Sequence, residues 1–423
     1  METNILNYGA VADGVTLNSE AIQKAIDAVA EAGGGRVTVP AGTFLTGTIW
    51  LKSHVELHLE NGAVLKASEK LEDYNEEDAY RQNYGFPPEG WVGKHLIVAV
   101  EQVGVSITGK GIIDGSADAF FAEPKHEFYT GFTFRYGVAF SKEGTLRPGQ
   151  TVCIIECRDV TIRDVSIVES PSWCFFIHGS EDVTVSGIRV KNTPWHANTD
   201  GIDIDASKNI TVSDCIIDTG DDAIAIRCAG YRIREDLQLC ENITITNCVC
   251  SARSSGVRLS VGKGTIRNVL MSNIVFRESS PAINLASAYN GKGKINIENV
   301  SFNNIIAEDV GIPVSIYENN DCRIKNVSVT NLKATGKCRC LIKADDVGTV
   351  SNVTFRDVDI ELSEPAFELT DYTRERRGKY AIEVDGVDGI RFDNVRVSKA
   401  DDVTLELYSE ENSTNVIKRD CNF

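Results

Sequence analysis

The sequence lacks long apolar runs and an excess of positive charge. None of its apolar runs approaches the roughly 18 consecutive residues of a membrane-spanning helix. Lysine and arginine together number 43, against 61 aspartates and glutamates, so the formal net charge is −18. Because an acidic surface repels nucleic acid and anionic lipid, we expect neither nucleic acid nor a membrane as a partner.

Two further patterns are missing. None of the 12 cysteines belongs to a Cys-x-x-Cys motif and no set of histidines accompanies them, so we expect no structural zinc site. Met1 is followed by neither a basic nor an apolar segment. Without an export signal a cytoplasmic location is expected, and there the cysteines are expected to be reduced thiols in the core.

A motif repeated along the chain decides the expected fold. Cys157-Arg-Asp-Val-Thr-Ile recurs as Ser180-Glu-Asp-Val-Thr-Val and Ser207-Lys-Asn-Ile-Thr-Val, and further copies follow at intervals of 23 to 33 residues. Each copy alternates apolar and polar residues, as a half-buried strand does. A unit this short cannot bury its own apolar face, so neighbouring units must stack. The sequence therefore predicts an all-β, single-stranded parallel β-helix that forms one domain over residues 1–423.

The remaining segments fit such a solenoid. Asparagine or aspartate precedes each repeated strand, where it tolerates a left-handed turn and can stack in a side-chain ladder. Residues 17–32 have one apolar face and predict a helix that caps the N-terminal end of the stack. Two insertions, 116–150 with many aromatics and 362–379 with Arg374, Arg376 and Arg377, are expected to line a binding groove.

Three carboxylates carry the expected chemistry. Asp200 lies 21 residues before Asp221, which Asp222 follows directly, so the spacing is a little under one coil. Because stacked strands lie about 4.8 Å apart, these side chains can converge on one patch. Hydrolysis of a glycosidic bond needs one protonated carboxyl group and one ionised carboxylate. Most other aspartates of this chain are expected to cap turns, and Asp203 and Asp205 are expected to point outward from a strand.

Several segments resemble the polygalacturonase family, glycoside hydrolase family 28. The similarity covers nearly the whole chain and includes Asn198-Thr-Asp-Gly-Ile-Asp, Gly220-Asp-Asp-Ala-Ile-Ala-Ile and Asn7-Tyr-Gly-Ala-Val-Ala-Asp-Gly. The resemblance implies a right-handed β-helix and single-displacement hydrolysis with inversion, without metal or organic cofactor. It also implies roles for four residues. They are Asp221 as general acid, Asp200 and Asp222 as holders of the attacking water, and Asn198 as the residue that orients Asp200.

Two motifs of this family are missing from the sequence. The family usually has Gly-His-Gly where this chain has Ser254-Ser255-Gly256. It also has Arg-Ile-Lys, whose charges hold the galacturonate carboxylate, where this chain has Ala282-Ile283-Asn284-Leu285. Loss of these charges disfavours a uronate at the cleavage site, because guanidinium and ammonium groups are the strong carboxylate ligands. A neutral sugar such as rhamnose or apiose is therefore favoured.

Further residues are candidates for substrate contacts. They are Trp173, His196, Arg227, Arg253, Ser255 and Arg258, together with Asn198. Trp173 lies one coil before Asp200 and could stack on a sugar ring or pack in the core. Arg253 and Arg258 flank the missing histidine and could replace its contacts or be solvated on a strand face. Arg227 could pair with an aspartate of the site or belong to an ordinary ladder.

Four functions remain open from the sequence. The favoured one is an exo-acting glycosidase that removes a terminal neutral sugar from plant-derived oligosaccharides or glycosides. The second is a galacturonan (pectin) hydrolase whose anion contacts moved to Arg253, Arg258 or Arg374. The third is a polysaccharide lyase, and the fourth is a non-catalytic β-helix binding module. A homodimer is allowed, because a solenoid leaves edges exposed.

Overall fold

The computed structural model describes residues 1–79, 90–125, 138–229, 238–288, 293–319, 321–364 and 377–423. It divides into two compact units, and each is described by itself. The first comprises residues 1–125 and 138–221, and the described part of the second runs from Asp222 to Phe423. The single domain expected over 1–423 stays a prediction. In the described part of the chain, no helix is long and apolar enough to cross a membrane.

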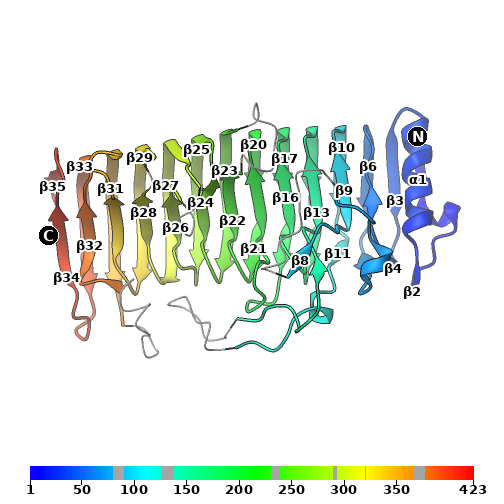
Figure 1. Cartoon of the computed structure of the whole chain (residues 1–423), viewed down its shortest axis with the longest axis horizontal. Coiled ribbons are helices and arrows are strands. Elements are labelled where there is room, and N and C mark those ends of the chain that lie inside the picture. Colours follow the sequence, from blue (N-terminus) through cyan, green and yellow to red (C-terminus); the bar gives the residue numbers. More distant parts are fainter. Residues whose placement is uncertain (80–89, 126–137, 230–237, 289–292, 320, 365–376) are drawn as a thin grey trace. The chain divides into compact units, whose positions relative to one another are not determined.

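Most strands of the first unit form three parallel ladders, in which each coil adds one strand to each ladder (Figure 1). The first ladder contains β1 (Glu2–Asn4), β3 (Gly35–Val39), β6 (Val55–Leu59), β10 (Val103–Gly109), β14 (Arg158–Arg163), β17 (Glu181–Ser186) and β20 (Lys208–Ser213). The second contains β2 (Asp13–Leu17), β4 (Gly42–Thr46), β7 (Ala63–Ala67), β11 (Ile112–Asp114), β15 (Ser166–Val168), β18 (Arg189–Lys191) and β21 (Ile216–Thr219). The third contains β5 (Ile49–Trp50), β9 (Ile97–Val100), β13 (Val152–Ile155), β16 (Phe175–His178) and β19 (Ile202–Asp205). A further pair joins β8 (Trp91–Val92) to β12 (Arg147–Pro148).

The second unit has two parallel ladders, and the strands of one are much longer. The long strands are β23 (Leu239–Ala252), β25 (Thr265–Arg277), β27 (Asn296–Val310), β29 (Ile324–Gly336), β31 (Val350–Leu362) and β33 (Asp388–Lys399), followed by β35 (Ile417–Arg419). The short strands are β22 (Ile224–Cys228), β24 (Val257–Gly262), β26 (Ile283–Ala286), β28 (Val314–Glu318), β30 (Cys340–Ala344), β32 (Tyr380–Asp385) and β34 (Glu406–Glu411). The prediction of an all-β parallel β-helix is confirmed.

Aliphatic side chains stack in rows inside the coils. In the first unit, Ile107 pairs with Ile162, Ile162 with Val185, and Val185 with Val212. All four side chains are buried. Because a strand alternates its side chains between two faces, the residues between them point outward. The repeated apolar–polar alternation of the sequence is thus the pattern of a strand with one face in the core.

Polar side chains form a second kind of row, at kinks near the start of the long strands. In the second unit, Asn268, Asn299, Asn326 and Asn352 each donate a side-chain hydrogen bond to the asparagine one coil earlier, and the row starts at Asn242. The backbone of each has a φ between 53° and 60°, in the left-handed region that asparagine tolerates better than most residues. The expected side-chain ladder is present, but its members lie at left-handed kinks inside the strands rather than at turns before them.

Replacement of Asn326 by alanine is expected to lower the free energy of unfolding by about 1–2 kcal/mol. Asn326 donates to Asn299 over 2.9 Å and accepts from Asn352 over 2.7 Å, at a φ of 56°. Alanine would lose both bonds and strain the backbone, whereas glycine would lose only the bonds. Denaturant unfolding of the wild type and both variants measures the difference. Equal losses for alanine and glycine would show that backbone conformation contributes nothing here.

The helix α1 (Ser19–Glu31) covers the start of the stack, as expected for residues 17–32 (Figure 1). It buries Ile22, Ala25, Ile26 and Val29. Among the described residues of the first unit are also the short 3-10 helices η1 (Ile5–Tyr8), η2 (Leu71–Asp73) and η4 (Ala117–Ala119). All 12 cysteines are free thiols, and every one except Cys421 is buried, in agreement with the expected reduced core thiols.

Both expected insertions are described only in part. Residues 126–137 of the first and 365–376 of the second, including Arg374 and Arg376, lie outside the described residues. Within the described part, Phe121 is buried. Arg377 forms a two-pronged ion pair with Glu364, so its charge is already compensated.

Candidate active site

Asp200 and Asp221 lie in the loops that follow paired strands of two successive coils in the first unit. Asp200 follows β18 and Asp221 follows β21. These strands pair in register, with Val190 opposite Ile217, so the turns after them lie side by side. Carboxylate oxygens of Asp200 and Asp221 lie within 4.8 Å of each other. The structure thus brings together two of the three carboxylates that the sequence singled out.

The turn before Asp200 holds Asp221 in place. The backbone N–H of Asn198 donates a hydrogen bond of 2.9 Å to Oδ2 of Asp221. Asn198 can aim its N–H in this direction because its φ is 57°, in the left-handed region. The resemblance implied that Asn198 orients Asp200, and that role stays a prediction.

Gly220 allows the two turns to approach this closely. A Cβ atom on Gly220 would lie 2.2 Å from the carbonyl oxygen of His196 and 2.7 Å from Oγ1 of Thr199. The N–H of Gly220 instead donates to that Thr199 hydroxyl over 3.1 Å. Any larger residue would push Asp221 away from Asp200, which explains glycine directly before the aspartate pair.

Arg147 supports the same turn, and the sequence reasoning missed it. Its Nη2 donates to Oδ1 of Asn198 over 2.9 Å and its Nη1 donates to the carbonyl oxygen of Pro171. The guanidinium carbon lies 4.9 Å above the ring of Phe121. Arg147 is fully buried, although it belongs to the insertion 116–150 that was expected to face a groove. Arg147 lies outside the repeated strand motif, so its position in the sequence does not predict this contact.

Asp222 begins the second unit and is bonded to Asp221 through the peptide link. Two successive Cα atoms are about 3.8 Å apart across a trans peptide, so Asp222 stays close to Asp221 by covalent geometry alone. Its side chain is fully buried. Oδ1 accepts a hydrogen bond of 2.7 Å from the N–H of Ser255, and Oδ2 lies 2.6 Å from Nη2 of Arg258. This buried carboxylate therefore has a charged partner and a backbone donor.

The other candidates of the second unit lie on strands β22 and β24 and in the turn between β23 and β24. Ser255 is buried, and its hydroxyl accepts a hydrogen bond of 3.3 Å from the side chain of Asn284. Arg258 is mostly buried with Asp222, so its charge is not freely available to a substrate. Arg253 is half-buried in the turn after β23, and Arg227 is buried in β22. Their expected substrate contacts stay predictions.

Several polar and aromatic residues of the first unit are more buried than expected. Asp203 and Asp205 are fully buried, so the outward direction expected for them does not bring them into contact with solvent. Strand β19 is buried on both faces, and a two-residue alternation cannot distinguish this case from an exposed face. Trp173 packs with Phe176 and Cys153 in an apolar cluster, which favours the core alternative for this tryptophan.

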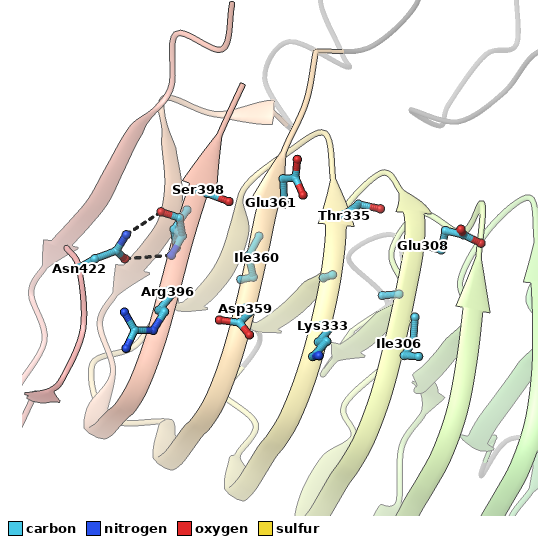
Figure 2. Close-up of a pocket in the computed structure, with 13 residues that line it drawn as sticks. Ile306, Glu308, Lys333, Thr335, Asp359, Ile360, Glu361, Arg396, Ser398 and Asn422 are labelled. Atoms are coloured by element: carbon cyan, nitrogen blue, oxygen red, sulfur yellow. Dashed lines mark hydrogen bonds between the residues drawn. The ribbon is translucent and has the colours of Figure 1, made fainter. Parts of the chain in front are cut away.

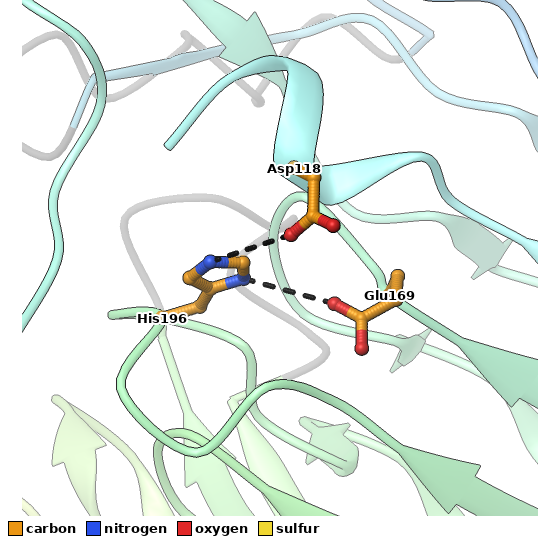
Figure 3. A group of neighbouring side chains, drawn as sticks. All are labelled: Asp118, Glu169 and His196. Carbon is orange, nitrogen blue, oxygen red and sulfur yellow. Dashed lines mark ion pairs between the residues drawn. The ribbon is translucent and has the colours of Figure 1, made fainter. Parts of the chain in front are cut away.

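His196 is buried next to the turn of Asn198. Its ring stacks on Phe121 with centroids 4.0 Å apart and planes 6° from parallel. Burial lowers the pKa of His196 to about 4; the charge of Arg147 lowers it further, and Asp118 opposes the shift. The imidazole is therefore neutral at neutral pH. In Figure 3 one ring nitrogen faces the carboxylate of Asp118 and the other faces the carboxylate of Glu169.

A surface cavity of about 600 Å³ lies along β27, β29, β31 and β33 of the second unit (Figure 2). Ile306, Lys333, Asp359 and Arg396 form a row of paired positions across it. The lining also includes two glutamates, so acids outnumber bases. This cavity therefore does not supply a cationic replacement for the missing Arg-Ile-Lys motif.

Comparison with known proteins places the chain in a family. Residues 31–336 match glycosyl hydrolases family 28. An exo-poly-alpha-D-galacturonosidase of Dickeya chrysanthemi is 29% identical over 87% of this chain, and the chain spans 64% of that relative's length. An endo-polygalacturonase of Pectobacterium carotovorum is 25% identical over 82% of this chain and 89% of the relative.

A solved structure agrees with both the fold and the sequence match. The hyperthermoactive exopolygalacturonase from Thermotoga maritima superposes with a TM-score of 0.71 and 26% identity, covering 94% of this chain and 92% of that chain. The family match itself includes the turn of Asn198 and Asp200, the Asp221–Asp222 pair and the strands that carry them. Because it covers well over half of the sequence, the chain belongs to glycosyl hydrolases family 28.

Proposed function

We propose that this protein is a glycoside hydrolase that removes terminal galacturonate from galacturonan chains. The observation that carries the proposal is the close approach of Asp200 and Asp221 on successive coils of a family 28 chain. Paired carboxyl groups at a cleft can supply the acid and the base that glycosidic hydrolysis needs. The names of all these relatives support the substrate class. The exo action is supported by the names of the Dickeya chrysanthemi relative and of the Thermotoga maritima structure, whereas the Pectobacterium carotovorum relative is an endo-polygalacturonase.

In the proposed reaction, Asp221 is the general acid. It gives its proton to the glycosidic oxygen while the bond from that oxygen to the anomeric carbon breaks. A water molecule held by Asp200 and Asp222 attacks the same carbon and loses a proton to one of these carboxylates. Arg258 compensates the negative charge of Asp222, so that carboxylate can stay in a buried place beside the water.

We propose that the reaction inverts the anomeric centre. Carboxyl groups of inverting glycosidases are typically about 6.5–9.5 Å apart, and those of retaining enzymes about 5 Å apart. The oxygens of Asp200 and Asp221 are within 4.8 Å, which by spacing alone resembles a retaining pair. Inversion is consistent with this short distance if the water binds beside both carboxylates rather than between them. Proton NMR of the first product formed distinguishes the two anomers directly.

A specific observation keeps a neutral terminal sugar as the second candidate. Asn284 occupies the segment where the family carries Arg-Ile-Lys, and its side chain is bonded to Ser255. Arg258, a candidate replacement, is already paired with Asp222. The three arginines proposed to bind the galacturonate carboxylate were Arg253, Arg258 and Arg374. Arg374 lies outside the described residues, so Arg253 is the described candidate that remains if galacturonate is the substrate.

Product analysis on a substrate panel tests the proposal. The panel contains polygalacturonate, oligogalacturonides, an aryl rhamnoside and apiose-bearing plant glycosides. We expect monomeric galacturonate from the first two and at least 100-fold slower release from the neutral glycosides. Release of rhamnose or apiose instead would support the second candidate. An unsaturated product would indicate a lyase, and no turnover of any compound would favour the binding module.

A further inference from the structure

Three side chains converge outside the Asp200–Asp221 pair. Asp118 comes from η4, Glu169 follows β15, and His196 lies in the loop after β18. Each carboxylate faces a different ring nitrogen of the imidazole (Figure 3). One carboxylate oxygen of each acid and one ring nitrogen of His196 all lie within 4.8 Å of one another.

His196 is buried in this cluster with an unsatisfied nitrogen. Only 3% of the residue is exposed, yet Nδ1 has no hydrogen-bond partner among the described residues. The nearest acidic atom is Oε2 of Glu169 at 3.8 Å, too far for a hydrogen bond. On the other side of the ring, Nε2 is 3.9 Å from Oδ1 of Asp118. A buried polar atom without a partner costs about 1–3 kcal/mol, so a missing ligand is a direct explanation.

The surroundings of the cluster carry excess negative charge. Burial raises the pKa of Glu169, the hydroxyl of Thr193 opposes this shift, and repulsion from Asp118 and Asp114 adds to it. The described hydrogen bonds of the Lys142 ammonium group go to the backbone carbonyls of residues 118 and 119, not to these carboxylates. A cation placed among the three side chains would relieve this repulsion.

We propose that Asp118, Glu169 and His196 bind one zinc ion. A neutral imidazole and two carboxylates are a ligand set that suits Zn²⁺, whereas Ca²⁺ and Mg²⁺ prefer oxygen alone. Zinc lies about 2.0–2.2 Å from such ligands, with water in the fourth position of a tetrahedron. Neighbouring donors would then be about 3.3 Å apart. One ion binds a single ring nitrogen, whereas Glu169 approaches Nδ1 and Asp118 approaches Nε2. With zinc at Nδ1, the exposed side chain of Asp118 would have to swing from its present place beside Nε2, within a group whose donor atoms already lie within 4.8 Å of one another.

Bound zinc would fasten the site turn to the insertion. Asp118 lies at the start of residues 116–150, and His196 lies two residues before Asn198, which bonds to Asp221. Asp118 is 86% exposed, so its side chain is free to close over an ion entering from solvent. The site would therefore be assembled by an exposed ligand closing on two less exposed ones. This proposal departs from the sequence expectation that the protein needs no metal.

Isothermal titration of the metal-free chain with zinc sulfate tests the site. All variants carry Cys421→Ser, because Cys421 is the only cysteine that is not buried. We expect one zinc ion per chain and a rise in Tm on binding. Asp118→Asn should weaken binding at least tenfold, and because the side chain is exposed, the substitution leaves the core packing unchanged. Glu181→Gln, at another exposed acid of the first unit, is the matched control and should bind as the parent does.

Two further measurements locate the ion. Asp200→Asn should keep zinc affinity within twofold, whereas loss of binding there would place the ion at the Asp200–Asp221 pair and overturn the proposal. Calcium chloride should compete at least 100-fold more weakly than zinc. Absence of saturable binding, equal affinity in Asp118→Asn, or equal competition by calcium would each refute the zinc site. All these readouts are independent of hydrolytic activity, so they also separate this proposal from the proposed function.

Discussion

Replacement of Asp221 by asparagine is expected to reduce kcat on the best substrate of the panel by about 1,000-fold. Asparagine has nearly the same shape and can still accept the 2.9 Å hydrogen bond from the N–H of Asn198. It cannot give a proton to the leaving oxygen, so the proposed acid step is lost while the turn is kept. Initial rates of product release, compared at equal protein concentration, measure the effect.

Two variants make this result specific. Asp200→Asn should give a loss of similar size, because it removes a carboxylate proposed to hold the attacking water. Glu181→Gln changes an exposed acid on β17 and should retain full activity. A fully active Asp221→Asn variant with an unchanged far-ultraviolet circular dichroism spectrum would refute the assigned role. If Asp221→Asn, Asp200→Asn and Glu181→Gln all lose activity equally, the loss does not come from the proposed catalytic carboxylates.

Replacement of Arg258 by methionine is expected to destabilise the protein by about 3–5 kcal/mol. The change leaves Asp222, which is fully buried, without the guanidinium that lies 2.6 Å from its Oδ2. One backbone hydrogen bond, from Ser255, remains. Urea unfolding followed by circular dichroism measures the loss. Hydrolysis should fall as well, because Asp222 would no longer be held beside the proposed water.

The second unit offers a matched control for this ion pair. Arg267 lies 2.7 Å from Glu241 on the adjacent strand, but its side chain is 44% exposed. Arg267→Met is expected to cost less than about 1 kcal/mol, because exposed ion pairs contribute little. The double variant Arg258→Met with Asp222→Asn should recover part of the stability lost in Arg258→Met. No recovery would mean that lost packing, rather than an uncompensated charge, causes the effect.

The fold could be predicted well from the sequence because every coil must bury the apolar face of its strand against the next coil. Stacking imposes an aliphatic residue inside each strand and an asparagine or aspartate at the left-handed position directly before it. These residues recur at Val160, Val183 and Ile210 and at the positions that precede them. The helix of residues 19–31 was equally readable, since its buried face follows the helical period. Features that repeat, or that follow a period, are the ones a single sequence reveals.

The candidate site could be predicted only in part. Asp200 and Asp221 were found because their spacing matches a coil, which is again a repeat argument. Arg147 was missed because it reaches the site from an insertion that follows no period. The burial of Asp203 and Asp205 was missed for a related reason. What covers the outer face of a strand depends on distant segments, and the strand's own sequence does not encode it.

The asparagine row of the second unit has a consequence for how such a chain can change in length. Its bonded members lie 26, 31, 27 and 26 residues apart, yet each joins its neighbour through the same side-chain hydrogen bond. The row therefore fixes the position of one residue in each coil, while the number of residues between two such positions can vary. Evolution can lengthen or shorten a loop, or duplicate a whole coil, without shifting the register of the strands that follow. New recognition surfaces can thus arise at the loops while the arrangement of the core is inherited unchanged.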